Sequence, residues 1–246
     1  MKKILLLNGS MRGEASSSLK VAKTFIAGIQ DCLDIQVTQI NLREKKINPC
    51  MGCFYCWKKG KGNCILQDDM QQLRELVMEN DIIIESFPLY FFGMPSQMKA
   101  FTDRMISYIS EYRASNGDQE SGRFLHEVRY PELMQKKFVM VSTCGYEKTE
   151  DCYDAIRVQF DRICGSKYTL ITAPQGGMLA EKTFEAKTAR YLTKFREAGK
   201  EYALQGQLSP ETLRKLEIPM LGHNVFSMAI NKNWDDDEVG PYGKPV

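Results

Sequence analysis

The sequence predicts one α/β domain, built on a five-stranded parallel sheet with helices on both faces, followed by a C-terminal extension. Five short apolar runs rich in branched residues carry this prediction, because each has the length of a buried strand. The runs cover residues 2–8, 34–40, 81–87, 137–143 and 168–173. Helical periods separate them, as the crossovers between parallel strands require. Ligands of such sheets bind beyond the carboxyl ends of the strands.

Apolar residues at spacings of three and four predict the helices between these strands. The four shorter helical faces consist of Leu19, Ala22, Phe25, Ile26 and Ile29; Met70, Leu73, Leu76 and Val77; Met98, Phe101, Met105 and Ile109; and Tyr153, Ile156, Phe160 and Ile163. A longer helix is predicted from about residue 181 to 202, with Phe184, Tyr191, Phe195 and Tyr202 on one side. The domain is therefore expected to span residues 1–205.

Two segments lie outside this scheme. Residues 111–136 are polar and broken by glycine and proline, so we expect an insertion that forms a lid or an oligomer contact. In the extension, residues 206–246, Ser209 and Pro210 are a helix start, and Pro219 ends that helix. The chain beyond it carries apolar residues that we expect to pack on the same domain or on a second subunit: Phe226, Met228, Ile230 and Trp234.

Composition excludes several classes of partner. The chain has 246 residues, with 33 lysines and arginines against 31 acidic residues. This balance argues against nucleic acid or an anionic membrane as the main partner. The apolar run Ile4–Leu7 is too short for a signal peptide, and no run reaches the roughly 18 apolar residues of a membrane span. A cytoplasmic protein with a small-molecule substrate is expected, and its eight cysteines are expected to be ligands, redox groups or core residues rather than disulfides.

The loop after the first strand has the composition of a phosphate site. It reads NGSMRGEASSSLK, from Asn8 to Lys20, and matches neither the dinucleotide-binding nor the P-loop pattern. Its hydroxyls, one cation and the free amides of a helix start suit a terminal phosphate monoester. The candidate ligands are Ser10, Arg12, Ser16, Ser17 and Ser18.

This loop resembles the flavin phosphate loop of the NADPH-dependent FMN reductase family, within the flavodoxin-like superfamily. Met11 replaces the family's usual proline, whereas Ser17 and Ser18 stand at its Asn and Thr positions and keep hydroxyl donors. A second stretch, SFPLYFFGMPSQMKAFTDR from Ser86 to Arg104, is similar to the family's next motif. The resemblance implies bound FMN and a flavodoxin-like sheet with strand order 2-1-3-4-5.

The resemblance also implies which residues surround the isoalloxazine ring. On one side these are Pro88, Leu89, Tyr90, Phe91, Phe92 and Gly93; on the other, Thr143, Cys144, Gly145 and Tyr146. Tyr90 and the two phenylalanines supply flat apolar surface for a flat cofactor. The alternative is that Phe91 and Phe92 are core residues. By the same reasoning, Asp103 and Arg104 would be a solvated ion pair.

Four cysteines form the pattern C-x2-C-x2-C-x7-C within the loop 48–66: Cys50, Cys53, Cys56 and Cys64. The pattern resembles that of the iron–sulfur flavoprotein branch of the superfamily, which implies a [4Fe–4S] cluster beside FMN. Many reductases of the wider family carry similar cysteines and use flavin alone, so the thiols could instead serve packing, dimer contacts or redox sensing. Cys144 and Cys164 are expected to be buried, and His126 and His223 have no catalytic partner in sequence.

Three functions follow from these motifs. The leading hypothesis is an FMN-dependent oxidoreductase that passes hydride from NAD(P)H to a quinone, flavin, azo or nitro acceptor, in which the flavin carries the chemistry and no side chain is catalytic. The alternative is an electron carrier with a [4Fe–4S] cluster and a ferredoxin-like partner. A thiol redox sensor is the third. The resemblance implies a homodimer or homotetramer.

Overall fold

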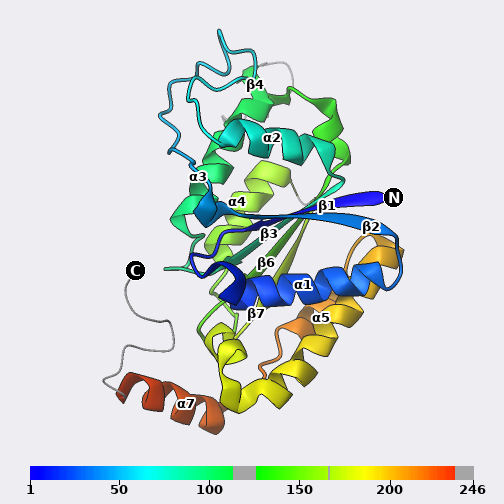
Figure 1. Cartoon of the computed structure of the whole chain (residues 1–246), viewed down its shortest axis with the longest axis vertical. Helices are drawn as coiled ribbons and strands as arrows, with labels where there is room; N and C mark the ends of the chain where they lie inside the picture. Colours follow the sequence, from blue (N-terminus) through cyan, green and yellow to red (C-terminus); the bar gives the residue numbers. More distant parts are fainter. Residues whose placement is uncertain (113–125, 166, 236–246) are drawn as a thin grey trace, which may run out of the picture.

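The computed structural model describes residues 1–112, 126–165 and 167–235. Five parallel strands form one sheet in the order β2-β1-β3-β6-β7 (Figure 1). Their bounds are β1 Lys2–Asn8, β2 Ile35–Asn41, β3 Ile82–Pro88, β6 Lys137–Thr143 and β7 Tyr168–Ala173. Because β4 and β5 belong to a second sheet, these five strands are the first to fifth of their own sheet along the chain, and their order is 2-1-3-4-5. The predicted fold class and strand order are confirmed.

Helices cover both faces of the sheet (Figure 1). Their bounds are α1 Ser17–Gln30, α2 Met70–Glu79, α3 Ser96–Arg104, α4 Asp154–Cys164 and α5 Glu185–Gln205. On one face, α1 and α5 pack so closely that a methyl group on Gly28 would lie 1.9 Å from the carbonyl oxygen of Arg196. The opposite face carries α2, α3 and α4 over a second apolar cluster. An apolar cluster therefore packs on each face of the sheet.

Three helical predictions need correction. The helix predicted through Met98 and Ile109 ends at Arg104, and a 3-10 turn over Met105–Tyr108 leads into strand β4, Ile109–Tyr112. Ile163 lies on the solvent face of α4 and is 54% exposed. The long helix starts at Glu185, four residues later than expected, so Phe184 precedes it. At Ile109 and Phe184 the hydrophobic spacing continued beyond the true helix end, whereas Ile163 lies within α4 but outside its buried face.

The inserted segment forms a small antiparallel pair, β4 with β5, His126–Val128. Residues 113–125 of the insertion lie outside the described residues, and a lid or an oligomer contact stays a prediction. The extension contains α6, Pro210–Leu216, with Ser209 as its N-cap as expected. It also contains α7, His223–Asp235, which the sequence analysis did not predict.

Helix α7 packs through one face only. Phe226 is buried against Met178 and Leu221, whereas Met228 is 74% exposed. Met228 therefore does not pack on its own domain, and its contact with a second subunit stays a prediction. The side chain of Trp234 lies outside the described part. None of the described helices has the length and apolar content to span a membrane.

Candidate cofactor sites

The loop after β1 is folded into a preformed cradle at the carboxyl edge of the sheet. Asn8 organises it: its Nδ2 donates to the Gly13 carbonyl at 3.0 Å, and its Oδ1 accepts from the Ser10 amide at 3.1 Å. Ser16 caps α1 by accepting from the Leu19 amide at 3.3 Å. The sequence analysis did not name Asn8 as a site residue. Its role could have been inferred from its residue type, because an asparagine side chain often accepts a hydrogen bond from the backbone amide two residues further on.

Four serines of this cradle are buried, and one of their hydroxyls lacks a partner. Ser10, Ser16, Ser17 and Ser18 are between 1% and 7% exposed, and Arg12 is half-buried. Ser16 and Ser18 share a hydrogen bond, whereas the Ser17 oxygen has none. Buried hydroxyls are almost always paired, so an orphaned hydroxyl in the first turn of α1 suits an anionic ligand. The residues present fit a phosphate group here.

The loop after β3 turns back on itself in a strained hairpin. Tyr90 and Gly93 exchange two backbone hydrogen bonds of 2.9 Å, and the intervening Phe91 and Phe92 have φ of 48° and 63°. Both values lie in the left-handed region, which bulky residues rarely adopt. Phe91 is fully exposed, and Tyr90 and Phe92 are each 46% exposed. The alternative that these phenylalanines belong to the core is wrong.

The loops after β3 and β6 lie together. The Leu89 amide donates to the Thr143 carbonyl at 2.8 Å, and the rings of Phe92 and Tyr146 stack with centroids 5.7 Å apart. Pro88, Leu89 and Gly93 are half-buried beneath them, and Gly145 is exposed. The phosphate loop joins the same edge, since the Gly9 amide donates to the Ser86 carbonyl at 2.8 Å. All three predicted flavin loops therefore meet at one place.

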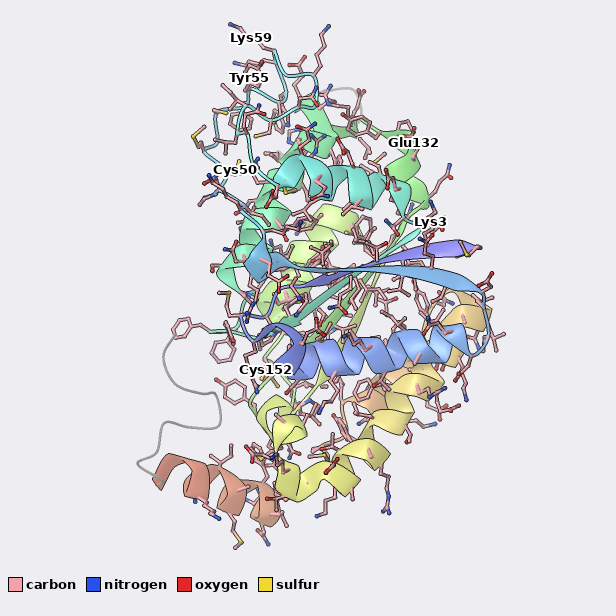
Figure 2. All side chains as sticks on the ribbon, viewed as in Figure 1. Lys3, Cys50, Tyr55, Lys59, Glu132 and Cys152 are labelled. Carbon is pink, nitrogen blue, oxygen red and sulfur yellow. The ribbon has the colours of Figure 1, made fainter. Side chains whose placement is uncertain are left out.

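Cys144 is turned into its own loop. It is 2% exposed, its Sγ lies 3.8 Å from the Lys148 carbonyl, and burial raises the pKa of this thiol to about 11. Cys152 approaches the same carbonyl at 3.6 Å. Figure 2 shows Cys152 well away from Cys50. Cys144 is thus a buried residue, as expected, and Cys164 is half-buried.

The four cysteines of the loop 48–66 line one pocket. In Figure 2 the labelled residues Cys50, Tyr55 and Lys59 show where this loop lies. The pocket is lined by Cys50, Cys53, Cys56 and Cys64 together with Phe54, Leu66, Arg104, Ile106 and Ser107. Burial raises the pKa of Cys56, and the charges of Cys64, Cys50 and Cys53 raise it further. The four thiols are therefore close enough to interact electrostatically.

Two glycines allow the chain to fold around this pocket. The Gly62 amide donates to the Cys56 carbonyl at 2.7 Å, with φ of 95° at Gly62, and a methyl group on Gly60 would lie 2.2 Å from the Asn63 carbonyl oxygen. The Trp57 indole donates to the Ile106 carbonyl at 2.9 Å and so joins the loop to the 3-10 turn after α3. Among the described residues, no three His, Cys, Asp or Glu side chains are placed to hold a single metal ion. A cubane cluster holds its thiolates further apart than one ion does, and the all-thiolate donor set fits it.

A buried ion pair anchors the cysteine loop to the body of the domain. Arg104 donates to both carboxylate oxygens of Asp68, at 2.8 and 3.0 Å, and to the Asn48 carbonyl at 2.8 Å. Burial alone would raise the pKa of Asp68, but hydrogen bonds from Arg104 and Asn48 outweigh it and lower the pKa to about 2. The alternative of a solvated pair between Asp103 and Arg104 is wrong. Asp103 instead pairs with Lys99 on the surface.

The two histidines have structural partners. His126 Nδ1 lies 3.1 Å from the Ser110 carbonyl, and its ring packs on Trp57 at 4.7 Å. His223 Nδ1 lies 2.8 Å from Oε2 of Glu147, and this contact joins α7 to the loop after β6. The sequence analysis found no such partner, because 76 residues separate the two.

Loops that meet at the carboxyl edge of a sheet of order 2-1-3-4-5 are typical of doubly wound folds that bind a ligand there. The family model described as a flavodoxin-like fold matches residues 2–196. The chain belongs to this family. Among curated proteins, this flavodoxin-like chain is similar to an iron–sulfur flavoprotein of Archaeoglobus fulgidus, with 42% identity over 30% of the chain and 32% of the relative. A second iron–sulfur flavoprotein, from Methanocaldococcus jannaschii, is 33% identical over 42% of the chain and 51% of the relative.

The chain thus spans about a third to about a half of the length of these curated relatives. Among solved structures, the flavodoxin-like domain resembles an FMN-dependent NADH-azoreductase from Bacillus anthracis in complex with FMN. The TM-score is 0.55 at 18% identity, over 82% of this chain and 100% of the other. An NAD(P)H:quinone oxidoreductase from Methanothermobacter marburgensis gives 0.56 at 14% identity, over 81% and 98%. At these identities the likeness shows the fold.

Proposed function

We propose that this protein is an FMN-dependent redox protein that carries a [4Fe–4S] cluster in the cysteine pocket. The convergence of four thiols on one pocket carries this proposal, because it joins a cluster-type donor set to a flavodoxin-like domain. This proposal favours the iron–sulfur alternative over the flavin-only oxidoreductase, which was the leading hypothesis from the sequence alone. The iron–sulfur flavoproteins among the relatives support this order.

The phosphate loop is the part of the chain that would hold FMN. Ser10, Ser17 and the first-turn amides of α1 would bind its phosphate, while the loops after β3 and β6 would flank its ring. FMN supplies hydride and single-electron chemistry when bound. The exposed rings of Tyr90, Phe92 and Tyr146 would exclude water from one side of it.

The cysteine loop is the part that would hold the cluster, through Cys50, Cys53, Cys56 and Cys64. A [4Fe–4S] cluster supplies single-electron exchange when bound. Three exposed lysines, Lys58, Lys59 and Lys61, lie on this loop, and the sequence from residue 48 to 67 contains no acidic residue. Such a surface favours encounter with an acidic electron-transfer protein, so the ferredoxin-like donor remains part of the proposal.

Replacing Ser17 with alanine tests the phosphate site. The loss of one charge-assisted hydrogen bond should weaken FMN binding by about tenfold to a hundredfold and leave riboflavin binding nearly unchanged, because riboflavin has no phosphate. Titration of the apoprotein with each flavin measures this. Thr24→Ala is the matched control, since the Thr24 hydroxyl bonds the Lys20 carbonyl further along α1. Equal losses for both flavins would show that the phosphate lies elsewhere.

Replacing Cys56 with serine tests the cluster. After anaerobic reconstitution with iron and sulfide, Cys56→Ser should lose at least about half of the bound iron, since one of four thiolate ligands is gone. Cys32→Ser should keep it all, because Cys32 is exposed on the α1 side and outside the pocket. Chemical analysis of iron and sulfide gives the answer. Identical contents in the two variants would remove Cys56 from the ligand set.

A second candidate function keeps FMN and omits the cluster. Tyr90, Phe91, Phe92 and Tyr146 expose flat apolar rings at the edge where the three loops meet, which favours stacking of an aromatic acceptor. In this candidate NAD(P)H reduces the flavin, and a quinone, flavin, azo or nitro compound takes the electrons. Full NAD(P)H-dependent turnover by protein free of iron would favour it over the cluster-containing form.

A further inference from the structure

One charged side chain lines the cysteine pocket without being one of the four thiol ligands. Arg104 lines the pocket beside Cys56 and Cys64, and its side chain is 2% exposed. Both of its terminal nitrogens are engaged, by Asp68 and by the Asn48 carbonyl. Its Nε is also buried, but has no hydrogen-bond partner.

A buried N–H group without a partner is unusual in a folded protein. Here the group belongs to a fixed cation in a pocket lined by four thiols. Burial lowers the pKa of Arg104, but the hydrogen bonds to Asp68 and the charge of Cys64 outweigh burial and hold the pKa above its ordinary value. Arg104 is thus a cation held by Asp68 and the Asn48 carbonyl, and its buried Nε–H is left without a partner in a side chain that lines the pocket.

We propose that Arg104 sets the reduction potential of the cluster bound in this pocket, by donating its Nε–H to a sulfur and by placing a positive charge beside it. The inference rests on the proposed function, in which the four cysteines hold a [4Fe–4S] cluster. Hydrogen bonds to the sulfurs and nearby charge are the main influences of a protein on such potentials. Both favour the reduced, more negative form of the cluster, so Arg104 raises the potential.

Asp68 acts on the pocket only through Arg104. Its two carboxylate oxygens accept hydrogen bonds from the two terminal nitrogens of Arg104 and so fix the direction of Nε. Asp68 itself does not line the pocket. A lysine at position 104 would keep the charge but lose the planar fork and the Nε donor. Asp68 is therefore a positioning residue, and the exact side chain at position 104 matters.

Redox titration of the reconstituted protein tests the inference. The variants are Arg104→Lys and the double variant Arg104→Gln with Asp68→Asn, which removes both buried charges together and so leaves neither unpaired. Each is titrated anaerobically while the electron paramagnetic resonance of the reduced cluster is recorded. We expect the double variant to hold about tenfold less reduced cluster at a fixed potential, a shift of about 59 mV for one electron. Arg104→Lys should shift in the same direction by less.

The matched control is Lys99→Gln with Asp103→Asn, which removes one cation and one anion from the surface of the same helix. Its potential should equal that of the unchanged protein. If the double variant and this control share one potential at equal iron content, the inference is overturned. If the double variant does not fold, Arg104→Lys decides, and an unchanged potential in it overturns the inference. If the unchanged protein binds no iron at all, the proposed function fails, and the inference with it.

Discussion

Replacing Glu85 with glutamine should raise the free energy of unfolding by about 3 kcal/mol at pH 8. Glu85 lies in the middle strand of the sheet, paired in register with Leu7 and Met140, and is 5% exposed. Its Oε2 has no hydrogen-bond partner. Burial raises the pKa of Glu85 from 4.5 to about 7, so ionisation above neutral pH works against the folded state.

The pH dependence has a definite sign. Between pH 4.5 and about 7 the folded protein holds a proton on Glu85 that the unfolded chain has released. Stability from this group is complete below pH 4.5 and is lost as the pH rises through about 7. Glutamine cannot ionise, so Glu85→Gln should remove this loss.

Urea denaturation of the apoprotein at pH 5 and pH 8 measures the effect. The unchanged protein should lose stability between the two values, whereas Glu85→Gln should lose much less. Glu79→Gln is the control, because Glu79 is exposed at the end of α2 and should leave the pH dependence as it was. Parallel pH profiles for the unchanged protein and Glu85→Gln would show that Glu85 finds a partner in solution.

Replacing Asp68 with asparagine should lower the free energy of unfolding by about 3–5 kcal/mol, since it leaves the Arg104 charge buried without its counterion. The Asp68 carboxylate also accepts from the Asn48 amide at 2.9 Å, so the loss extends to the start of the cysteine loop. The pKa of Asp68 is lowered from 3.8 to about 2, so its contribution is present above pH 3.8 and is lost as the pH falls through about 2.

Thermal and urea denaturation at pH 7 measure this loss. Asp103→Asn is the matched control on the neighbouring pair, where Lys99 and Asp103 are 46% and 43% exposed. Exposed pairs contribute less than about 1 kcal/mol, so this variant should unfold almost as the unchanged protein does. Equal losses in the two variants would mean that Arg104 relaxes toward solvent when Asp68 is neutral.

Local patterns predicted the sheet well because each buried strand is a short apolar run with its own boundaries. Residues 137–143 and 168–173 form strands at the predicted positions. The helix through Ile109 was overextended because hydrophobic spacing alone does not reveal where a helix stops. Helix α7 was missed because its apolar residues were read as an irregular tail, although Phe226, Ala229 and Ile230 share one helical face.

The candidate sites show the same division. The serines of the phosphate loop are adjacent in sequence, so their shared role could be inferred from composition. The partner of Arg104 could not, because Asp68 lies 36 residues away and the nearer Asp103 offered a simpler pairing. The exposure of Phe91 could not be predicted from the sequence either. It depends on the left-handed backbone at residues 91 and 92, which turns this apolar side chain toward solvent.

The central claim is that one chain holds both FMN and a cluster, and the composition of anaerobically purified protein tests it most directly. Iron, acid-labile sulfide and flavin are measured on one sample, together with its visible spectrum. The account predicts about four irons, four sulfides and one FMN per chain. Stoichiometric flavin without iron would contradict the cluster and favour the flavin-only oxidoreductase. Protein that binds neither would contradict the whole account.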